Sequence, residues 1–313
     1  MASVKRVLLQ NVGRSFDILA WFPSDEILSA DICKIITPME EEATTRMMPS
    51  LPRDWHSKFP ESSHQNDKGH PLLWNRKVLF FFHGWAGLPI FHRLAIERAV
   101  LSGYIVISPL HAGSSLVAIN EFSNTISADR NPPENPYEQL AWFDEKIDNW
   151  SNFSDHVVKY IYQRWDVFCE ACKIPVSNHP TFYAAAGFSA GGAVAWNVSQ
   201  KNDFISAVCN IDGTFCGTQR HARRPIPLLL VCHELTKESG TEMEIMLHLA
   251  REHELLHDYD GTHQKIVIKG ANHRSFSDLS AASERICGAV SNISQSERYI
   301  LQASDAILDF FRW

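Results

Sequence analysis

The chain has 313 residues, of which 45% are hydrophobic and 21% charged, as in ordinary globular proteins that bury a large core. Its formal net charge of -7 argues against a general affinity for nucleic acid or for an anionic membrane surface. No apolar run approaches the roughly 20 residues of a membrane-spanning helix, and the start of the chain lacks the apolar core of a signal peptide. Seven cysteines, an odd number, favour reduced thiols. We therefore expect a cytoplasmic protein without an integral membrane segment.

Two short strands are expected at the start of the chain, Val4 to Leu9 and Phe16 to Phe22, joined as a hairpin around Gly13. Residues 24–75 follow as an irregular insertion that is rich in proline and carries an acidic triplet at 40–42. This segment is too long for a plain loop, so we expect it to pack on the body of the protein or to cover a site.

From residue 77 onward, short apolar runs alternate with longer amphipathic segments. The predicted strands are 77–82, 104–108, 182–186, 204–211, 226–232 and 264–268. The predicted helices are 90–101, 135–173 with a break near 149–154, 192–198, 241–258 and 297–311. This alternation predicts an α/β fold with a mainly parallel sheet and helices on both faces. We expect a single domain over 1–313, with the segments at 24–75 and 109–175 as candidate lids.

The sequence Gly-Phe-Ser-Ala-Gly at 187–191 lies between a predicted strand and a predicted helix. A nucleophile elbow requires this context, because a tight, strained turn pushes the serine out on its tip and leaves no room for bulky neighbours. Gly187, Gly191 and Gly192 meet that need. Ser189 is therefore the candidate nucleophile, and the alternative is a glycine-rich turn that carries a serine by accident.

A serine alcohol needs a base to take its proton and an acid to hold that base in the right tautomer. In sheets of this kind the chain order is serine, acid, histidine. His273 lies in a glycine-containing loop directly after the last predicted strand, and we expect it to be the base rather than a surface histidine. His233 ends an earlier strand, too soon in the chain for that order.

Two carboxylates end predicted strands between Ser189 and His273. Asp212 follows the strand next after the serine, and Glu234 follows the strand after that. We favour Asp212, because its short side chain is the more rigid and because Gly213 leaves the backbone free to turn there. Glu234 remains the alternative acid.

Stabilising a tetrahedral intermediate takes two backbone N–H donors. The residue after the nucleophile, Ala190, is expected to supply one, and the loop His83-Gly84-Trp85 after the first central strand the other. Gly84 would let the backbone approach, and Trp85 would give its N–H while its ring lines the pocket. The alternative for this His-Gly pair is a plain turn at the end of a strand.

Two other patterns compete for a functional role. His253 to His257 spell H-E-x-x-H on a predicted helix, a zinc-binding pattern, but no third ligand is evident beside it. A basic cluster of Arg220, Arg223 and Arg224 would either meet an anionic substrate group or be solvated. We therefore expect neither a metal nor an organic cofactor.

The residues from about 77 to the C-terminus resemble those of the α/β-hydrolase fold, and more closely the platelet-activating-factor acetylhydrolase family in its plasma and intracellular type II branch. The resemblance is carried by the stretches FFHGWAG at 81–87, GYIVISPLHAGSS at 103–115, GFSAGG at 187–192, LLLVCHEL at 228–235 and IVIKGANHRSFSDLS at 266–280. It implies a catalytic triad of Ser189, Asp212 and His273, with Trp85 and Ala190 as oxyanion donors.

The chain departs from that family beside the nucleophile, where Phe188 and Ala190 stand in place of the family's usual histidine and phenylalanine. The segments at 24–75 and 109–175 do not match the family either. Those segments usually shape the pockets for the acyl and leaving groups, so phospholipid specificity is not carried over.

We expect a serine hydrolase that cleaves a small-molecule carboxylic ester, such as a short-acyl ester, a lactone or a phospholipid-like ester, through an acyl-enzyme. An acyltransferase or a carbon–carbon bond hydrolase on the same fold is the alternative, and a non-catalytic binding protein is a further one. No nucleic-acid partner is expected, and a homodimer is left open.

Overall fold

The computed structural model describes residues 3–12, 16–24, 38–47, 77–116, 118–119, 125–126, 128, 131–174, 179–221, 224–236, 239–287 and 293–312. Within these residues, an eight-stranded sheet forms the centre of the protein, with the strand order β1-β2-β4-β3-β7-β8-β9-β10. Its strands are β1 (Ser3–Val12), β2 (Phe16–Ser24), β3 (Lys77–Phe82), β4 (Tyr104–Leu110), β7 (Phe182–Phe188), β8 (Ile205–Ile211), β9 (Leu228–His233) and β10 (His263–Ile268). β2 is antiparallel to β1 and β4, and every other neighbouring pair is parallel. The predicted mainly parallel sheet is confirmed.

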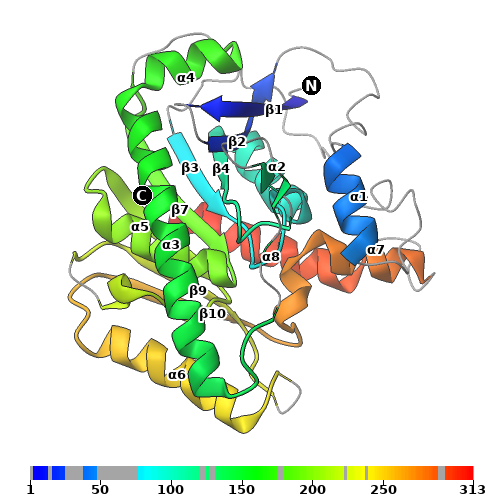
Figure 1. Cartoon of the computed structure of the whole chain (residues 1–313), viewed down its shortest axis with the longest axis vertical. Coiled ribbons are helices and arrows are strands. Elements are labelled where there is room, and N and C mark those ends of the chain that lie inside the picture. The colour runs from blue at the N-terminus through cyan, green and yellow to red at the C-terminus, as the bar shows by residue number, and fades with distance from the viewer. Residues whose placement is uncertain are drawn as a thin grey trace.

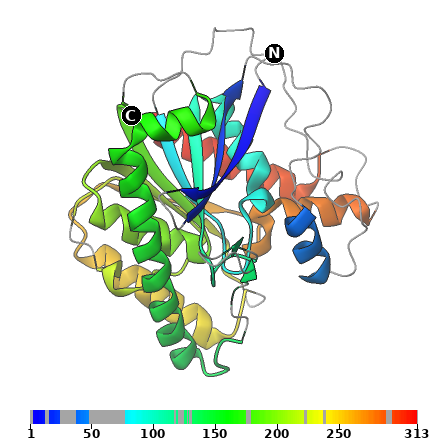
Figure 2. The same cartoon turned by 45° about the horizontal axis from the view of Figure 1, so that its top comes forward.

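Helices lie on both faces of this sheet (Figure 1). The helices are α1 (Pro38–Met47), α2 (Arg93–Leu101), α3 (Pro136–Gln163), α4 (Trp165–Cys172), α5 (Ala190–Lys201), α6 (Glu242–His257), α7 (Asp278–Ile286) and α8 (Gln295–Phe310). Three 3-10 turns, η3 (Pro89–His92), η4 (Thr218–Arg220) and η5 (His273–Phe276), and a short ribbon of β5 (Ala118–Ile119) and β6 (Thr125–Ile126) complete the described elements. Side chains of α3, α4 and α5 fill the core on one face, and those of α2 and α8 fill the core on the other. Figure 2 shows the strands fanned between these two layers.

The central strand β3 lies between two hydrophobic cores, which explains why its sequence is an unbroken apolar run. Val78, Phe80 and Phe82 belong to one hydrophobic core, and Leu79 and Phe81 belong to the other. Successive side chains of a strand point to opposite faces, so a strand covered by helices on both sides is apolar at every position.

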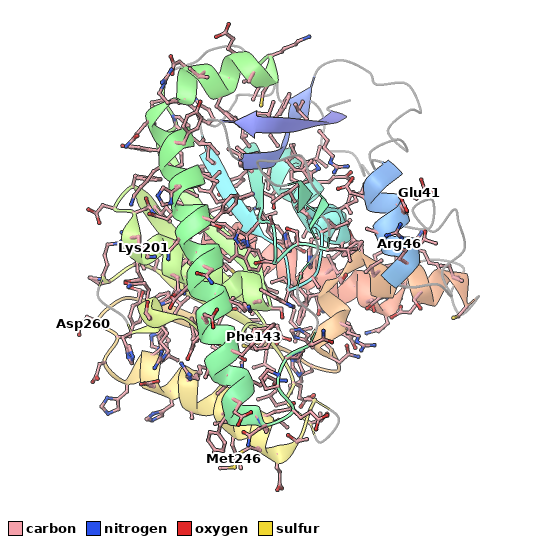
Figure 3. The ribbon with its side chains drawn as sticks, in the orientation of Figure 1. Glu41, Arg46, Phe143, Lys201, Met246 and Asp260 are labelled. Atoms are coloured by element: carbon pink, nitrogen blue, oxygen red, sulfur yellow. The ribbon has the colours of Figure 1, made fainter. Side chains whose placement is uncertain are left out.

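The sequence predicts an irregular segment at 24–75, and this prediction is wrong for residues 38–47, which form α1. Glu40 lies in the first turn of α1 and Arg46, labelled in Figure 3, in its last turn. The acidic triplet therefore suits the positive end of a helix dipole. Glu40 also accepts a 2.7 Å hydrogen bond from Arg6 on β1, which ties α1 to the edge of the sheet. The remainder of the insertion lies outside the described residues.

The predicted helix break near 149–154 is also wrong. α3 runs without interruption to Gln163, and the chain bends at Arg164 before α4. The small polar residues Ser151 and Ser154 are buried rather than exposed at a turn. Ser151 accepts a 3.4 Å hydrogen bond from Asn197 on α5, so these side chains mark the place where two helices approach closely.

The other predicted strands and helices are present, with ends that differ by about three residues or fewer. The helix predicted over 90–101 divides into η3 and α2, and the chain leaves it through Gly103, whose φ of 92° is the left-handed conformation of a helix cap. α7 is an element that the sequence analysis misses. Among the described helices, none is long and apolar enough to cross a bilayer. The six cysteines of the described residues form no disulfide.

Candidate active site

Ser189 lies in the turn between β7 and α5, with a φ of 55° that is unfavourable for a residue with a side chain. Glycines allow this turn to close. A Cβ on Gly187 would lie 2.1 Å from the carbonyl oxygen of Gly191, and a Cβ on Gly191 would lie 2.2 Å from that of Phe82. The Ser189 N–H donates to the carbonyl of Ile211 at 2.8 Å, which fixes the turn to the next strand.

A hydrogen-bonded chain connects the candidate nucleophile, base and acid. His273 Nε2 lies 3.0 Å from Ser189 Oγ, and His273 Nδ1 lies 2.6 Å from Asp212 Oδ2. With the Nδ1–H donating to the carboxylate, Nε2 is left to accept the serine proton. Phe188 stacks on the imidazole, with ring centroids 4.9 Å apart and planes at 27°, so the residue beside the nucleophile also holds the ring in place.

Asp212 follows β8 in a sharp turn. Its own φ is 57°, so the left-handed conformation falls on the aspartate and not on Gly213 as the sequence suggests. Gly213 serves close packing, because a Cβ there would lie 2.2 Å from the carbonyl oxygen of Ser189. The side chain of Asn210 closes the turn, with its Nδ2 donating to the Gly213 carbonyl and its Oδ1 accepting the Gly213 N–H, both at 2.9 Å.

The Asp212 carboxyl is nearly buried, yet it is held in its charged form. Burial by itself would raise the pKa of Asp212, but hydrogen bonds from His233 and His273 offset burial and hold the pKa well below its usual range. The carboxylate is therefore ionised at neutral pH and can stabilise a protonated imidazole. The alternative acid is directed elsewhere: Glu234 Oε2 lies 3.4 Å from the backbone nitrogen of Gly270. Of the two candidates, the structure brings Asp212 to His273.

The loop after β3 is fixed by a buried histidine. His83 Nδ1 donates to the carbonyl of Gly84 at 2.7 Å, and its Nε2 accepts from the Ser115 hydroxyl at 2.9 Å. Burial lowers the pKa of His83 to about 4, so the neutral ring can donate from one nitrogen and accept at the other. Trp85 and Ala190 both line the cavity beside Ser189. Because Ala190 is the first residue of α5, its N–H has no partner within the helix.

A cavity of about 310 Å³ opens onto the candidate triad. Arg251 on α6 donates to both carboxylate oxygens of Asp144 on α3, at 3.3 and 2.8 Å, which joins the two helices around this cavity. Figure 3 shows the parts of α3 and α6 that carry Phe143 and Met246 at the same end of the molecule. Apolar side chains form most of the wall, namely Trp85, Leu140, Phe143, Ile147, Leu235, Ile245 and Leu247.

Polar side chains interrupt the apolar wall, among them Gln139, Thr214, Glu244 and His248. Thr214 Oγ1 lies 2.7 Å from His248 Nδ1, and both residues line the cavity. Burial lowers the pKa of His248, so this ring is neutral at pH 7 and acts by hydrogen bonding rather than by charge.

No protein-family model and no curated protein sequence matches the chain. Solved structures do match it. A ferulic acid esterase from Streptomyces cinnamoneus aligns with a TM-score of 0.64 and 14% sequence identity, over 99% of this chain and 88% of that one. A dienelactone hydrolase from Anabaena variabilis aligns with a TM-score of 0.50 and 10% identity, over 99% of this chain and 97% of that one. The chain has the α/β-hydrolase fold.

In this α/β-hydrolase fold, the candidate residues gather at the carboxyl ends of the strands, where ligands of open parallel sheets bind. The sequence predicts the candidate triad there, but it does not predict three further residues beside it. His233 is assigned no role because it comes early in the chain, although its position at the end of a strand was a usable signal. Thr214 and His248 give no signal, since neither belongs to a recognisable motif.

The H-E-x-x-H pattern lies on the exposed side of α6, and none of its residues lines the cavity at the candidate triad. His253, Glu254 and His257 are all exposed, and Glu254 lies 3.6 Å from Arg220 in an ion pair. Among the described residues, the group whose ligand atoms come within 4.8 Å of one another is a different one, namely Asp212, His233 and His273.

The basic cluster has structural contacts. Arg224 donates to the carbonyls of Ser199, Asn202 and Ile205 at 2.6, 3.2 and 2.9 Å, so it caps the end of α5. Within the described part of the chain, neither Arg220 nor Arg224 lines the cavity. Arg223 lies outside the described residues.

A buried carboxyl anchors the segment that carries His273. Asp278, the first residue of α7, is fully buried, and its Oδ2 accepts a 2.9 Å hydrogen bond from the Leu94 N–H of α2. Burial raises the pKa of Asp278 to about 8. The folded chain therefore binds this proton more tightly than the unfolded chain does.

The free energy of unfolding is accordingly expected to fall as pH rises from about 4 to about 8, by up to about 1.4 kcal/mol per pH unit from this group. Asp278→Asn keeps the acceptor but cannot ionise, so its stability should decline less over that range and exceed that of the wild type near about pH 8. Urea unfolding of both proteins near the two ends of the range measures this. Equal pH slopes for the two proteins would contradict it.

Proposed function

We propose that the chain is a serine hydrolase of carboxylic esters, with Ser189, His273 and Asp212 as its catalytic triad. The observation that carries the proposal is the hydrogen-bonded chain through these residues, with distances of 3.0 and 2.6 Å, beside a largely apolar cavity. A base within reach of an alcohol, and an acid that orients that base, meet the geometric requirements for nucleophilic catalysis.

In the proposed reaction, Ser189 Oγ attacks the ester carbonyl carbon while His273 Nε2 takes the hydroxyl proton. The N–H groups of Ala190 and Trp85 donate to the resulting oxyanion. The bond to the alcohol oxygen then breaks, and His273 returns the proton to that oxygen, which leaves an acyl group on Ser189. Water, deprotonated by the same ring, attacks the carbonyl carbon of the acyl-enzyme. The bond to Ser189 Oγ breaks, His273 returns the proton to that oxygen, and the acid is released. The Asp212 carboxylate stabilises the protonated imidazole in both halves.

Turnover of p-nitrophenyl acetate and butyrate by the purified full chain tests this proposal. The expected products are nitrophenol and the free acid, also when an alcohol acceptor is added, which separates hydrolysis from acyl transfer. A folded protein that releases no nitrophenol from either ester and reacts with no fluorophosphonate would contradict the proposal.

The cavity favours a compact substrate. At about 310 Å³ it lies at the small end of ligand sites, which suits a short acyl group or a single ring better than a long fatty chain. Apolar side chains dominate its wall, and Gln139, Thr214, Glu244 and His248 add polar groups, so we propose an ester that carries one hydroxyl or carbonyl on an otherwise apolar acid. A phospholipid-like ester with a short acyl group, one of the substrate classes expected from the sequence, is the alternative.

A matched pair of substrates tests the role of Thr214. We expect methyl 3-(hydroxyphenyl)propanoate, in its 3- or 4-hydroxy form, to be cleaved with a kcat/KM about 5- to 10-fold above that of methyl 3-phenylpropanoate, as one hydrogen bond would give. Thr214→Val preserves the shape of the side chain and removes its hydroxyl, so it should abolish this preference with little effect on the unsubstituted ester. A preference that survives the substitution would place the polar contact elsewhere.

A further inference from the structure

A second histidine contacts the acid of the triad. His233, the last residue of β9, is 8% exposed, and its Nδ1 lies 2.7 Å from each of the two Asp212 carboxylate oxygens. Its backbone N–H also donates to Asp212 Oδ1 at 2.9 Å. With His273 on Oδ2, the carboxylate accepts hydrogen bonds from two imidazole rings and one backbone amide.

The hydrogen bonds around His233 define its tautomer. Ser239 Oγ accepts the N–H of Thr236 at 2.9 Å and lies 3.0 Å from His233 Nε2. The Ser239 hydroxyl proton is therefore free to point at Nε2, which accepts it. The remaining ring proton is then on Nδ1, where it faces Asp212. Ser239 thus fixes the tautomer of His233 by donating to Nε2, whereas Asp212 fixes that of His273 by accepting from Nδ1.

The side chain of His233 is outside the path of the proton, because its Nε2 is directed at Ser239 and not at Ser189. It acts instead on the direction of the carboxylate. Without the ring, Asp212 Oδ1 would accept only the hydrogen bond from the backbone N–H of His233, and the carboxylate could rotate away from His273. A misplacement of about 1 Å in a catalytic group is enough to lower a rate by about 100-fold.

We propose that His233 is a positioning residue of the triad, which Ser239 orients and which holds the Asp212 carboxylate on His273. This inference rests on the proposed ester hydrolysis. It assigns a role to His233, which comes too early in the chain to be the predicted base, and to Ser239, for which the sequence predicts no role.

Three variants test this inference. Asparagine can donate from Nδ2 near the position of the histidine Nδ1, whereas leucine cannot donate. We expect His233→Leu to lower kcat by about 10- to 100-fold with KM changed by less than about 2-fold, and His233→Asn to retain most of the activity. Ser239→Ala should fall between wild type and His233→Leu. The exposed His253 on α6 provides the matched control, since His253→Leu should leave both parameters unchanged.

The rate at which a fluorophosphonate labels Ser189 is measured in parallel, because it reports the activation of the serine without a turnover substrate. It should fall in the same order as kcat. The inference is overturned if His233→Leu keeps the wild-type kcat, if His233→Asn loses as much as His233→Leu, or if KM alone changes. If His233→Leu does not fold, the rates of His233→Asn and Ser239→Ala are compared with that of the wild type instead. A wild-type rate for Ser239→Ala then overturns the proposed orientation of His233 by Ser239. If the wild type itself hydrolyses no ester and is not labelled, the proposed function fails, and this inference fails with it.

Discussion

Ser189→Ala is expected to abolish ester hydrolysis, with kcat lowered by at least about 10⁴-fold. The substitution removes the only atom of the triad that attacks the carbonyl, and His273 Nε2, 3.0 Å away in the wild type, then has no alcohol to activate. Alanine fits wherever serine fits, so the fold should be retained. The measurement is the steady-state release of nitrophenol from p-nitrophenyl acetate.

A matched serine elsewhere on the sheet controls for the loss of a hydroxyl. Ser206 is exposed near the start of β8, at the opposite end of that strand from Asp212. Ser206→Ala should stay within about 2-fold of the wild type. If Ser189→Ala keeps most of the activity, a different group is the nucleophile.

Asp212→Asn is expected to have the second largest effect, lowering kcat by about 10³- to 10⁴-fold. Asparagine has nearly the shape of aspartate, but it carries no charge and turns an NH₂ group toward one of two imidazole N–H donors. His273 would lose its tautomer, its orientation or both. Activity on p-nitrophenyl acetate measures the loss, and circular dichroism shows whether the fold is kept.

Glu234→Gln is the control for this carboxylate. Because Glu234 is directed at the Gly270 N–H rather than at His273, its amide should change kcat by less than about 3-fold. The opposite ranking, with Glu234→Gln inactive and Asp212→Asn active, would transfer the role of the acid to Glu234.

An element of the fold can be predicted from the sequence where its residue pattern has a single physical explanation. The apolar run at 77–82 is typical of a strand buried on both faces. The glycines around Ser189 are required because added Cβ atoms would overlap backbone carbonyls. The prediction is wrong where a residue pattern has two possible explanations. The acidic triplet at 40–42 is compatible with a solvated loop and with a helix start, and the serines of α3 are compatible with a turn and with a close helix contact.

Prediction of the candidate site from the sequence is limited as well, because the contacts between its residues form only in the folded chain. Strand order places Asp212 and His233 at the ends of neighbouring strands, but no short motif predicts that a histidine 21 residues later donates a hydrogen bond to the acid. The choice between Asp212 and Glu234 depends on the direction of each side chain, which the sequence does not encode in a short motif. Likewise, α6 looks like an ordinary surface helix until its contact with α3 creates a cavity wall.

The most direct test of the central claim is the covalent capture of the nucleophile. The purified full chain is treated with a fluorophosphonate, its intact mass is measured, and the labelled peptide is sequenced. A single adduct on Ser189, and none in Ser189→Ala, is the expected result. An adduct on another residue, or the absence of any adduct in a protein that hydrolyses esters, would contradict it.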